Sequence, residues 1–174
     1  MRRLLLIILI ISTSYAQQQA DSVGFYVKIG DPSPNFALTF PNGDSTSFAE
    51  LKSKVIMLQF TASWCSVCRQ EMPYIEKDIV QNLKCDDLVV IGVDLDEPAE
   101  KVIKFADDMK ITYPLALDPG AKIFELFADK NSGVTRNVII DREGNIAYLT
   151  RLFNMEEFNQ MVEKIKVLLK DDGG

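Results

Sequence analysis

Histidine is absent from this sequence of 174 residues. Its absence excludes catalysis by Ser/His or Cys/His pairs, zinc sites with histidine ligands and the usual copper sites. Proton transfer near neutral pH must then use carboxylates, thiols, lysine, tyrosine or water. A catalytic site in this chain has to be built from these groups.

Cysteine is scarce as well, with three in the whole chain. A fold held together by many disulfides is excluded, because such folds are dense in cysteine. Two of the three cysteines form the pair Cys65-x-x-Cys68, and the third, Cys85, lies in a loop-like polar segment at residues 84–87. We interpret Cys85 as a passive small residue, with a regulatory or intermolecular thiol as the alternative.

Positive charge is in the minority, since 19 lysines and arginines stand against 25 aspartates and glutamates and give a net charge of −6. An acidic chain without a basic run argues against nucleic-acid binding. No internal repeat or low-complexity segment is visible. The length fits one domain plus a targeting segment.

Residues 1–16 predict a secretory signal peptide. Arg2 and Arg3 form its charged start, residues 4–11 its apolar part, and Ser14-Tyr15-Ala16 a small-x-small cleavage site. The apolar run is short for a bilayer span, although an uncleaved anchor is the alternative. In both cases we expect the domain to be periplasmic or to face the periplasm. We expect an extended leader at residues 17–30, the folded domain at 31–170 and a frayed tail at 171–174.

Hydrophobic periodicity predicts alternating strands and helices after the leader. A small β-hairpin with an Asn-Gly turn is expected first. Asp96 should cap one helix that has Pro98 in its first turn, and Asn154 with Glu157 resembles a capping box that opens the last helix. The expected strands are 36–40, 45–48, 55–61, 88–93, 138–140 and 146–150, with a short strand or extended segment at 114–117. The expected helices are 68–83, the one that follows Asp96 and includes 99–109, a short one ending at 127, and the last one, opened by Asn154 and reaching 169.

The cysteine pair lies where an apolar strand ends and a helix begins. Unpaired N–H groups and the positive end of the helix dipole favour a thiolate at that point, and the thiolate is the form that attacks disulfides. A strand, a C-x-x-C pair and a helix predict a dithiol redox site. Cys65, at the helix start and nearest solvent, is expected to attack, and Cys68 to resolve. A structural disulfide or an inert pair is the alternative.

The longer motif Trp-Cys-x-x-Cys-x-x-Glu-x-Pro, which runs from Trp64 to Pro73, resembles the active-site signature of the TlpA/ResA branch of the thioredoxin superfamily. The resemblance extends from about Ile29 to Leu169. It implies an α/β, thioredoxin-like fold: a central mixed sheet flanked by helices, with an N-terminal β-hairpin and a central helical insertion. It also implies an exported, often membrane-tethered thiol–disulfide oxidoreductase.

Glu71 is the predicted proton carrier, because it follows Cys68 by one helical turn and a buried carboxylate has a raised pKa. It matches the glutamate that TlpA/ResA-type proteins place near the site. Thioredoxin uses an aspartate on the preceding strand instead, and the matching residue here is Gln59, which cannot titrate. The alternative is a solvated carboxylate paired with Arg69 or Lys77.

Two positions depart from the family pattern. Ser66 and Val67 replace the x-Pro pair common between such cysteines. Thr135 stands where relatives carry a cis-proline, in the loop that faces the cysteines and includes Val134. Because a cis bond before a non-proline residue costs about 3–4 kcal/mol, we expect a trans peptide, with the Thr135 hydroxyl near the dithiol. We expect Trp64, Ser66, Val67, Pro73, Val134 and Thr135 to line the site.

The leading hypothesis is an exported protein-disulfide reductase that needs no cofactor or metal. The resemblance implies cysteine-containing exported protein substrates, as in cytochrome c maturation, and a thiol–disulfide electron donor in the membrane, and it leaves the oligomeric state open. Three other hypotheses remain. A Cu(I)-binding module would use two thiolates, a thiol peroxidase is suggested by Thr135-Arg136, and a redox-silent interaction domain is the third.

Overall fold

The structure is a computed structural model that describes residues 20–171. One seven-stranded mixed sheet forms its centre, in the order β2-β1-β5-β4-β3-β6-β7. The strands are β1 (Ala37–Thr39), β2 (Ser45–Ser47), β3 (Val55–Thr61), β4 (Leu88–Leu95), β5 (Leu115–Asp118), β6 (Arg136–Ile140) and β7 (Ile146–Arg151). The predicted α/β, thioredoxin-like fold is confirmed, as is the hairpin of β1 and β2.

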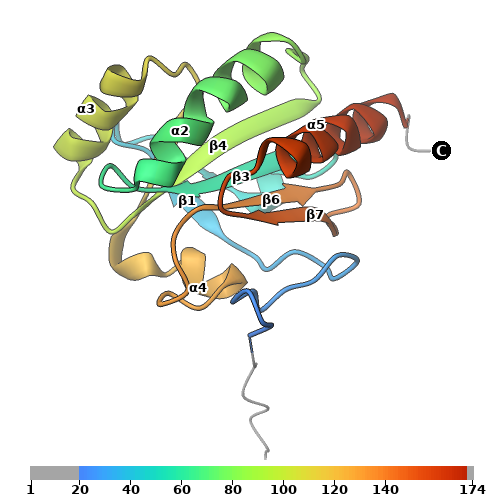
Figure 1. Cartoon of the computed structure of the whole chain (residues 1–174), viewed down its shortest axis with the longest axis horizontal. Helices are drawn as coiled ribbons and strands as arrows, with labels where there is room; N and C mark the ends of the chain where they lie inside the picture. The colour runs from blue at the N-terminus through green and yellow to red at the C-terminus, as the bar shows by residue number, and fades with distance from the viewer. Residues whose placement is uncertain (1–19, 172–174) are drawn as a thin grey trace, which may run out of the picture.

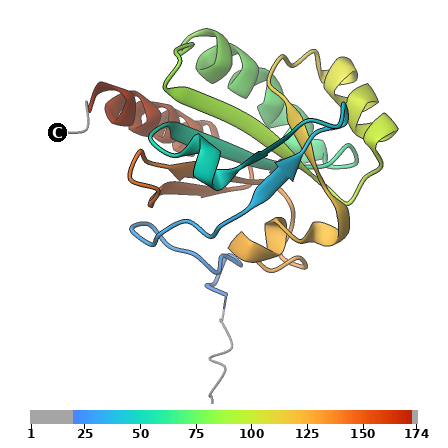
Figure 2. The same ribbon diagram turned by 180° about the vertical axis from the view of Figure 1, so that it is seen from behind.

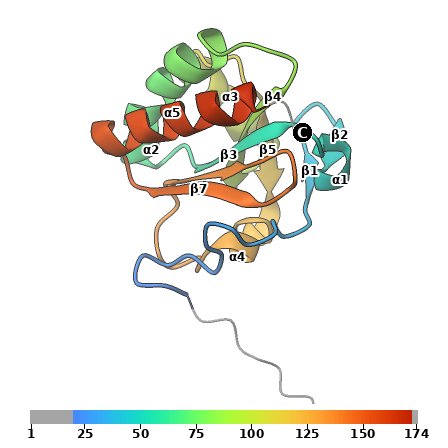
Figure 3. The ribbon, with the colours of Figure 1, turned by 90° about the vertical axis from the view of Figure 1, so that its right-hand side faces the viewer.

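The helices lie on both faces of this sheet (Figures 1 and 3). Three of them, α2, α3 and α5, cover one face, and α4 with the N-terminal segment covers the other. Seen from behind, the α4 side also shows the β1–β2 hairpin (Figure 2). The helices are α1 (Phe48–Leu51), α2 (Ser66–Tyr74), the π-helix η1 (Ile75–Gln81), α3 (Ala99–Met109), the 3₁₀ turn η2 (Pro119–Ala121), α4 (Phe124–Phe127) and α5 (Met155–Lys170).

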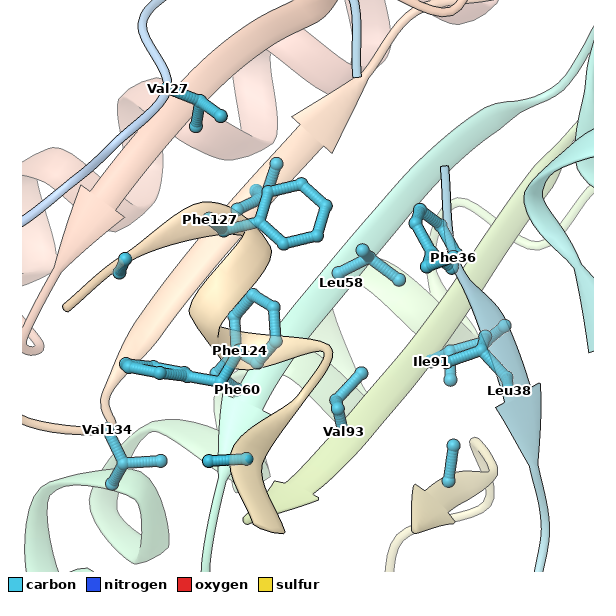
Figure 4. Close-up of a cluster of buried hydrophobic side chains, with 14 of the residues drawn as sticks. Val27, Phe36, Leu38, Leu58, Phe60, Ile91, Val93, Phe124, Phe127 and Val134 are labelled. Carbon is cyan, nitrogen blue, oxygen red and sulfur yellow. The ribbon is translucent and has the colours of Figure 1, made fainter. Parts of the chain in front are cut away.

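Strand β3 explains how the sheet is centred. Its seven residues are all buried, it runs parallel to β4 and antiparallel to β6, and its apolar run agrees with the predicted central position. Side chains alternate along the strand, so Phe60 faces α4 while Met57 faces the α2 side. Figure 4 shows Phe60 packed with Phe124 and Phe127 beneath the carboxyl end of β3. This core fixes the point from which the chain turns into α2.

The helix expected over 68–83, with a kink at Pro73, is present as two differently wound parts that together span residues 66–81. Its α-helical part ends at Tyr74, and the wider π-helix η1 follows at once. Pro73 has no N–H to give to the preceding turn, so the regular ladder is interrupted there. The interruption at Pro73 takes the form of a change in winding, from an α-helix to a π-helix.

Two further expectations about helix starts are corrected. Asp96 does not cap α3; the N-cap is Pro98, and the Asp96 carboxylate instead accepts the N–H of Gly120 at 2.7 Å. Asn154 caps α5 as expected, accepting from the backbone of Glu156 and Glu157. The single turn α1 was not expected, because four residues are too few to show helical periodicity.

The N-terminal segment packs against the domain from residue 23 onward. The side chains of Phe25 and Val27 are buried in the same core cluster as Phe60. Within residues 20–171, no helix combines the length and the apolar character that crossing a bilayer requires. The expected signal peptide at 1–16 and most of the expected tail lie outside the described residues.

Candidate active site

Cys65 and Cys68 form a disulfide at the amino-terminal end of α2, with their Cα atoms 5.3 Å apart. Cys65 is the N-cap residue, and its Sγ accepts the backbone N–H of Cys68 at 3.1 Å. Cys65 keeps 7% of its surface exposed and Cys68 none. The difference in exposure agrees with the predicted order, in which Cys65 meets a partner first and Cys68 acts from behind it.

Thr135 lies against both sulfurs from the loop before β6. Its Oγ1 is 3.1 Å from Cys65 Sγ and 3.3 Å from Cys68 Sγ. All peptide bonds in the described residues are trans, which confirms the trans bond expected at this position. Val134 beside it is also buried. The expectation that the Thr135 hydroxyl lies near the dithiol is confirmed.

Glu71 lies beneath α2 with 1% of its surface exposed. Its carboxylate accepts the Asn137 side-chain amide at 2.6 Å and, more weakly, that of Gln59 at 3.5 Å. Burial raises the pKa of Glu71 to about 7, and the hydrogen bonds from the two amides oppose the rise. The alternative of a solvated carboxylate is wrong, since Arg69 instead donates to the carbonyl of Ser63.

The amides that hold Glu71 belong to a buried polar network across the sheet. Gln59 on β3 and Asn137 on β6 are directly opposite each other and share the face below α2. The Tyr113 hydroxyl donates to Gln59 Oε1 at 2.7 Å, and Asn137 Nδ2 also donates to Thr150 Oγ1 at 2.8 Å. Sequence reasoning noticed Gln59 but missed the other three. A polar residue inside an otherwise apolar strand was the available signal.

The loop that leads into the cysteines is held at Ser63. Glu97 accepts the Ser63 backbone N–H at 2.5 Å and its hydroxyl at 2.8 Å, and Lys101 forms an ion pair with Glu97. Arg69 holds the Ser63 carbonyl at 2.8 Å from the other side. Every polar group of Ser63 is therefore paired, which fixes the backbone two residues before Cys65.

Asp94 is a second buried carboxyl group near this loop, and the sequence analysis missed it. Its surface is fully buried, and neither carboxylate oxygen accepts a hydrogen bond in the described residues. Burial and the negative charge of Glu97 raise the pKa of Asp94 to about 8. With this pKa the carboxyl group is mostly protonated at neutral pH. It can then donate a hydrogen bond to Glu97, whereas an ionised Asp94 would have to accept one.

The remaining predicted site residues divide by position. Trp64 is 62% exposed beside Cys65, Ser66 is exposed in the first turn of α2, and Val67 in the same turn is half-buried against the core. Pro73 is eight residues beyond Cys65, about 12 Å along the helix axis, so the structure does not place it beside the sulfurs. Cys85 is an exposed free thiol in the loop before β4, away from the pair.

Arg136, which with Thr135 suggested a peroxidase, does not serve the sulfurs. It is fully buried, its guanidinium lies 4.4 Å from the ring centre of Phe25, and it donates to the carbonyls of Val23 and Ser132. The arginine of a peroxide site would have to face the attacking thiolate. The peroxidase hypothesis therefore loses the feature that suggested it. In the part of the chain described, no cluster of three or more Cys, Asp or Glu side chains is arranged to hold a metal ion.

Comparisons with known proteins agree with this geometry. The family model described as AhpC/TSA matches residues 29–149. The thiol-disulfide oxidoreductase ResA of Bacillus cereus is 29% identical over 120 residues, which cover 69% of this chain and 68% of that protein. The thioredoxin-like protein YneN of Bacillus subtilis is 37% identical over 95 residues, covering 53% of this chain and 55% of that protein.

Solved structures of similar fold are also named as proteins of thiol–disulfide exchange. The solution structure of a candidate protein disulfide isomerase from Bacteroides thetaiotaomicron has a TM-score of 0.82 and 53% identity, covering 84% of this chain and 93% of that one. A candidate thiol:disulfide interchange protein named DsbE from Chlorobium tepidum has a TM-score of 0.72 and 26% identity, covering 82% and 99%. Together with the C-x-x-C pair at the start of α2, these matches show that the chain belongs to the AhpC/TSA family of thioredoxin-like proteins and is a thiol–disulfide oxidoreductase that acts on cysteine-containing substrates.

Proposed function

We propose that the chain is a reductase in which Cys65 attacks the disulfide of an exported protein and Cys68 resolves the mixed disulfide. The observation that carries the proposal is the place of Cys65 at the N-cap of α2, where its sulfur accepts the Cys68 N–H at 3.1 Å. A thiolate at this point is stabilised by that N–H and by the helix dipole.

The reaction takes two exchanges. The Cys65 thiolate attacks one sulfur of the substrate disulfide, so a mixed disulfide forms and the second substrate sulfur leaves as a thiolate. Cys68 then loses its proton, attacks Cys65 Sγ and releases the first substrate sulfur as a thiolate. Two electrons pass from the dithiol to the substrate, and the pair ends as the disulfide seen in the structure.

Glu71 is proposed to take the proton from Cys68 in the second exchange. It follows Cys68 by one turn of α2, and its pKa of about 7 leaves a large fraction ionised at neutral pH. Its carboxylate is hydrogen-bonded to amides and not to a sulfur, so a water molecule would have to bridge it to Cys68. The absence of histidine leaves few other buried groups with a pKa in this range.

The expected signal peptide and the ResA-like relatives support an exported location, with the dithiol facing the periplasm. In that compartment a reductase must be supplied with electrons, and a thiol–disulfide donor in the membrane fits this need. Exported proteins with paired cysteines, including those of cytochrome c maturation, are the proposed substrates.

The test is the equilibrium reduction potential of the Cys65–Cys68 pair, followed through Trp64 fluorescence in glutathione or dithiothreitol buffers, with Cys68→Ser as the control. A value near that of thioredoxin, about −270 mV, supports a reductase. A value near about −120 mV shows an oxidant and reverses the proposed direction of electron flow. If no reversible two-electron transition is found, the two cysteines are not the working pair.

A further inference from the structure

Few polar groups contact the two sulfurs. Cys65 Sγ meets the Cys68 N–H at 3.1 Å and Thr135 Oγ1 at 3.1 Å. Cys68 Sγ meets Thr135 Oγ1 at 3.3 Å and the carbonyl oxygen of Phe60 at 4.0 Å. Among the described side chains, the Thr135 hydroxyl is thus the polar group that the hydrogen-bond geometry places on both sulfurs.

The site around this hydroxyl is closed to solvent. Thr135 is 4% exposed, Cys65 7% and Cys68 not at all. In such surroundings a thiolate is costly unless it accepts hydrogen bonds, because burial favours the neutral thiol. A buried hydroxyl likewise needs a partner for its proton. The Thr135 hydroxyl can therefore donate the hydrogen bond that a buried thiolate needs, and the thiolate is the acceptor that the proton of the buried hydroxyl needs.

A hydroxyl donates one proton and accepts through its lone pairs. In the reduced protein it can receive the S–H of Cys68 and give its own proton to the Cys65 thiolate. We propose that Thr135 is a catalytic residue that determines which sulfur of the reduced pair carries a proton, because its hydroxyl stabilises Cys65 as the thiolate and Cys68 as the thiol. The proposal rests on the proposed function in taking Cys65 as the attacking cysteine.

The same hydroxyl serves the second exchange. Once Cys65 is bonded to the substrate, its sulfur carries no negative charge and is a weak acceptor. After Cys68 gives up its proton, the Thr135 O–H turns to the Cys68 thiolate. Cys68 Sγ then forms the bond to Cys65 Sγ, the Cys65–substrate bond breaks and the substrate sulfur leaves with the electron pair. The hydroxyl keeps its proton throughout, so atoms and electrons balance.

The test compares Thr135→Val, which keeps the shape and loses the hydroxyl, with Thr135→Ser, which keeps the hydroxyl. The thiol pKa values of the reduced proteins are measured by the ultraviolet absorbance of the thiolate. Because one hydrogen bond to the charged form is lost, the first thiol pKa of Thr135→Val is expected to rise by about one pH unit. Below that pKa, alkylation of Cys65 by iodoacetamide slows up to about tenfold. Thr135→Ser should remain near the parent protein.

Thr61→Val is the matched control, because Thr61 is an equally buried threonine at the end of β3 whose hydroxyl contacts Met72 Sδ and no cysteine. It should leave the thiol titration unchanged. If Thr135→Val does not fold, Thr135→Ala gives the same comparison without the added methyl group.

A first thiol pKa that stays at the parent value in the hydroxyl-free variant overturns the proposal, as does an equal shift in Thr135→Ser. Failure of the proposed function would be visible separately, as a potential near that of a strong oxidant in the parent protein, and would leave the titration result intact.

Discussion

At the scale of single residues, the site depends on how burial and hydrogen bonds balance at one carboxyl group. Desolvation pushes the pKa of Glu71 upward, while the amides of Asn137 and Gln59 favour the charged form. The outcome, about 7, lies where a proton acceptor is most useful. The two neutral amides thus keep the pKa of the buried Glu71 carboxyl group from rising further.

The raised pKa has a consequence for stability. Between about pH 4.5 and 7 the unfolded chain has lost the Glu71 proton and the folded chain still holds it, so stability falls as pH rises through this window. A shift of this size corresponds to roughly 3 kcal/mol when complete. The free energy of unfolding of Glu71→Gln, relative to that of the parent protein, should therefore increase as pH rises. Urea unfolding of both oxidised proteins at pH 4 and pH 8 measures the gain, and equal differences at the two pH values would contradict it.

Asn137→Leu tests whether the hydrogen bond from Asn137 lowers the pKa of Glu71. Loss of the 2.6 Å hydrogen bond to the carboxylate should raise the Glu71 pKa further, by about one pH unit. The acidic limb of the rate of mixed-disulfide resolution should move to higher pH by the same amount. Stopped-flow fluorescence across pH 5–9 gives the profile. Glu71→Gln is the comparison, since it should lose the limb altogether, and an unshifted limb in Asn137→Leu would exclude the proposed influence.

Sequence reasoning reached some of these residues and not others for a physical reason. Cys65, Cys68 and Glu71 lie within seven consecutive residues, so helical spacing alone relates them. The partners of Glu71 come from elsewhere: Asn137 is 66 residues away in sequence, and Tyr113 is 54 residues from Gln59. Such contacts depend on which distant segments become neighbours in the fold, such as β3 and β6, and spacing along the chain does not show this.

At the scale of elements, the apolar strands and amphipathic helices were predictable because burial of one face imposes a period on the sequence. The places that were not predictable are where a local interaction competes with that period. Pro73 changes the winding from α to π, and Asp96 turns to Gly120 instead of capping α3. In the loop from β4 to α3, Glu97 binds Ser63 and Asp96 binds Gly120, and the spacing of residues in the sequence does not show these contacts.

The carboxyl end of β4, which leads into that loop, gives an element-scale prediction through Asp94. Its raised pKa means that the folded protein holds a proton that the unfolded chain has lost, so stability falls as pH rises through about 8. Asp94→Asn keeps a donor for Glu97 and removes the titration. Its melting temperature should exceed that of the parent protein by more at pH 9 than at pH 6. Asp108→Asn, an exposed acid on α3, should show no such difference, and parallel behaviour of both variants would refute the assignment.

At the scale of the whole molecule, the N-terminal segment is part of the structure that supports the site. Phe25 lies over the guanidinium of Arg136, which directly follows Thr135 in the chain. Gly24 approaches so closely that an added Cβ would come within 2.3 Å of Ser132. Sequence analysis expected an extended leader here and found no signal for this packing, because two apolar side chains are too few to form a pattern.

Phe25→Ala should therefore destabilise the whole domain by about 3–5 kcal/mol, the usual range for loss of a buried phenylalanine. Val23→Ala is the matched control, since Val23 is 43% exposed and contributes its backbone carbonyl to Arg136. It should unfold with the parent protein in urea. Equal midpoints for all three proteins would show that the segment rests on the surface without supporting it.

The contact between this segment and β6 also defines how force would travel through the molecule. A pull applied at residue 20 would first load the bonds from Val23 to Arg136 and from Gly24 to Asp129. Because Arg136 is both the first residue of β6 and the covalent neighbour of Thr135, tension on the leader would enter the sheet at the residue that adjoins the loop facing the sulfurs. A pull on this segment would thus be borne at the start of β6, one residue from the threonine that contacts both sulfurs.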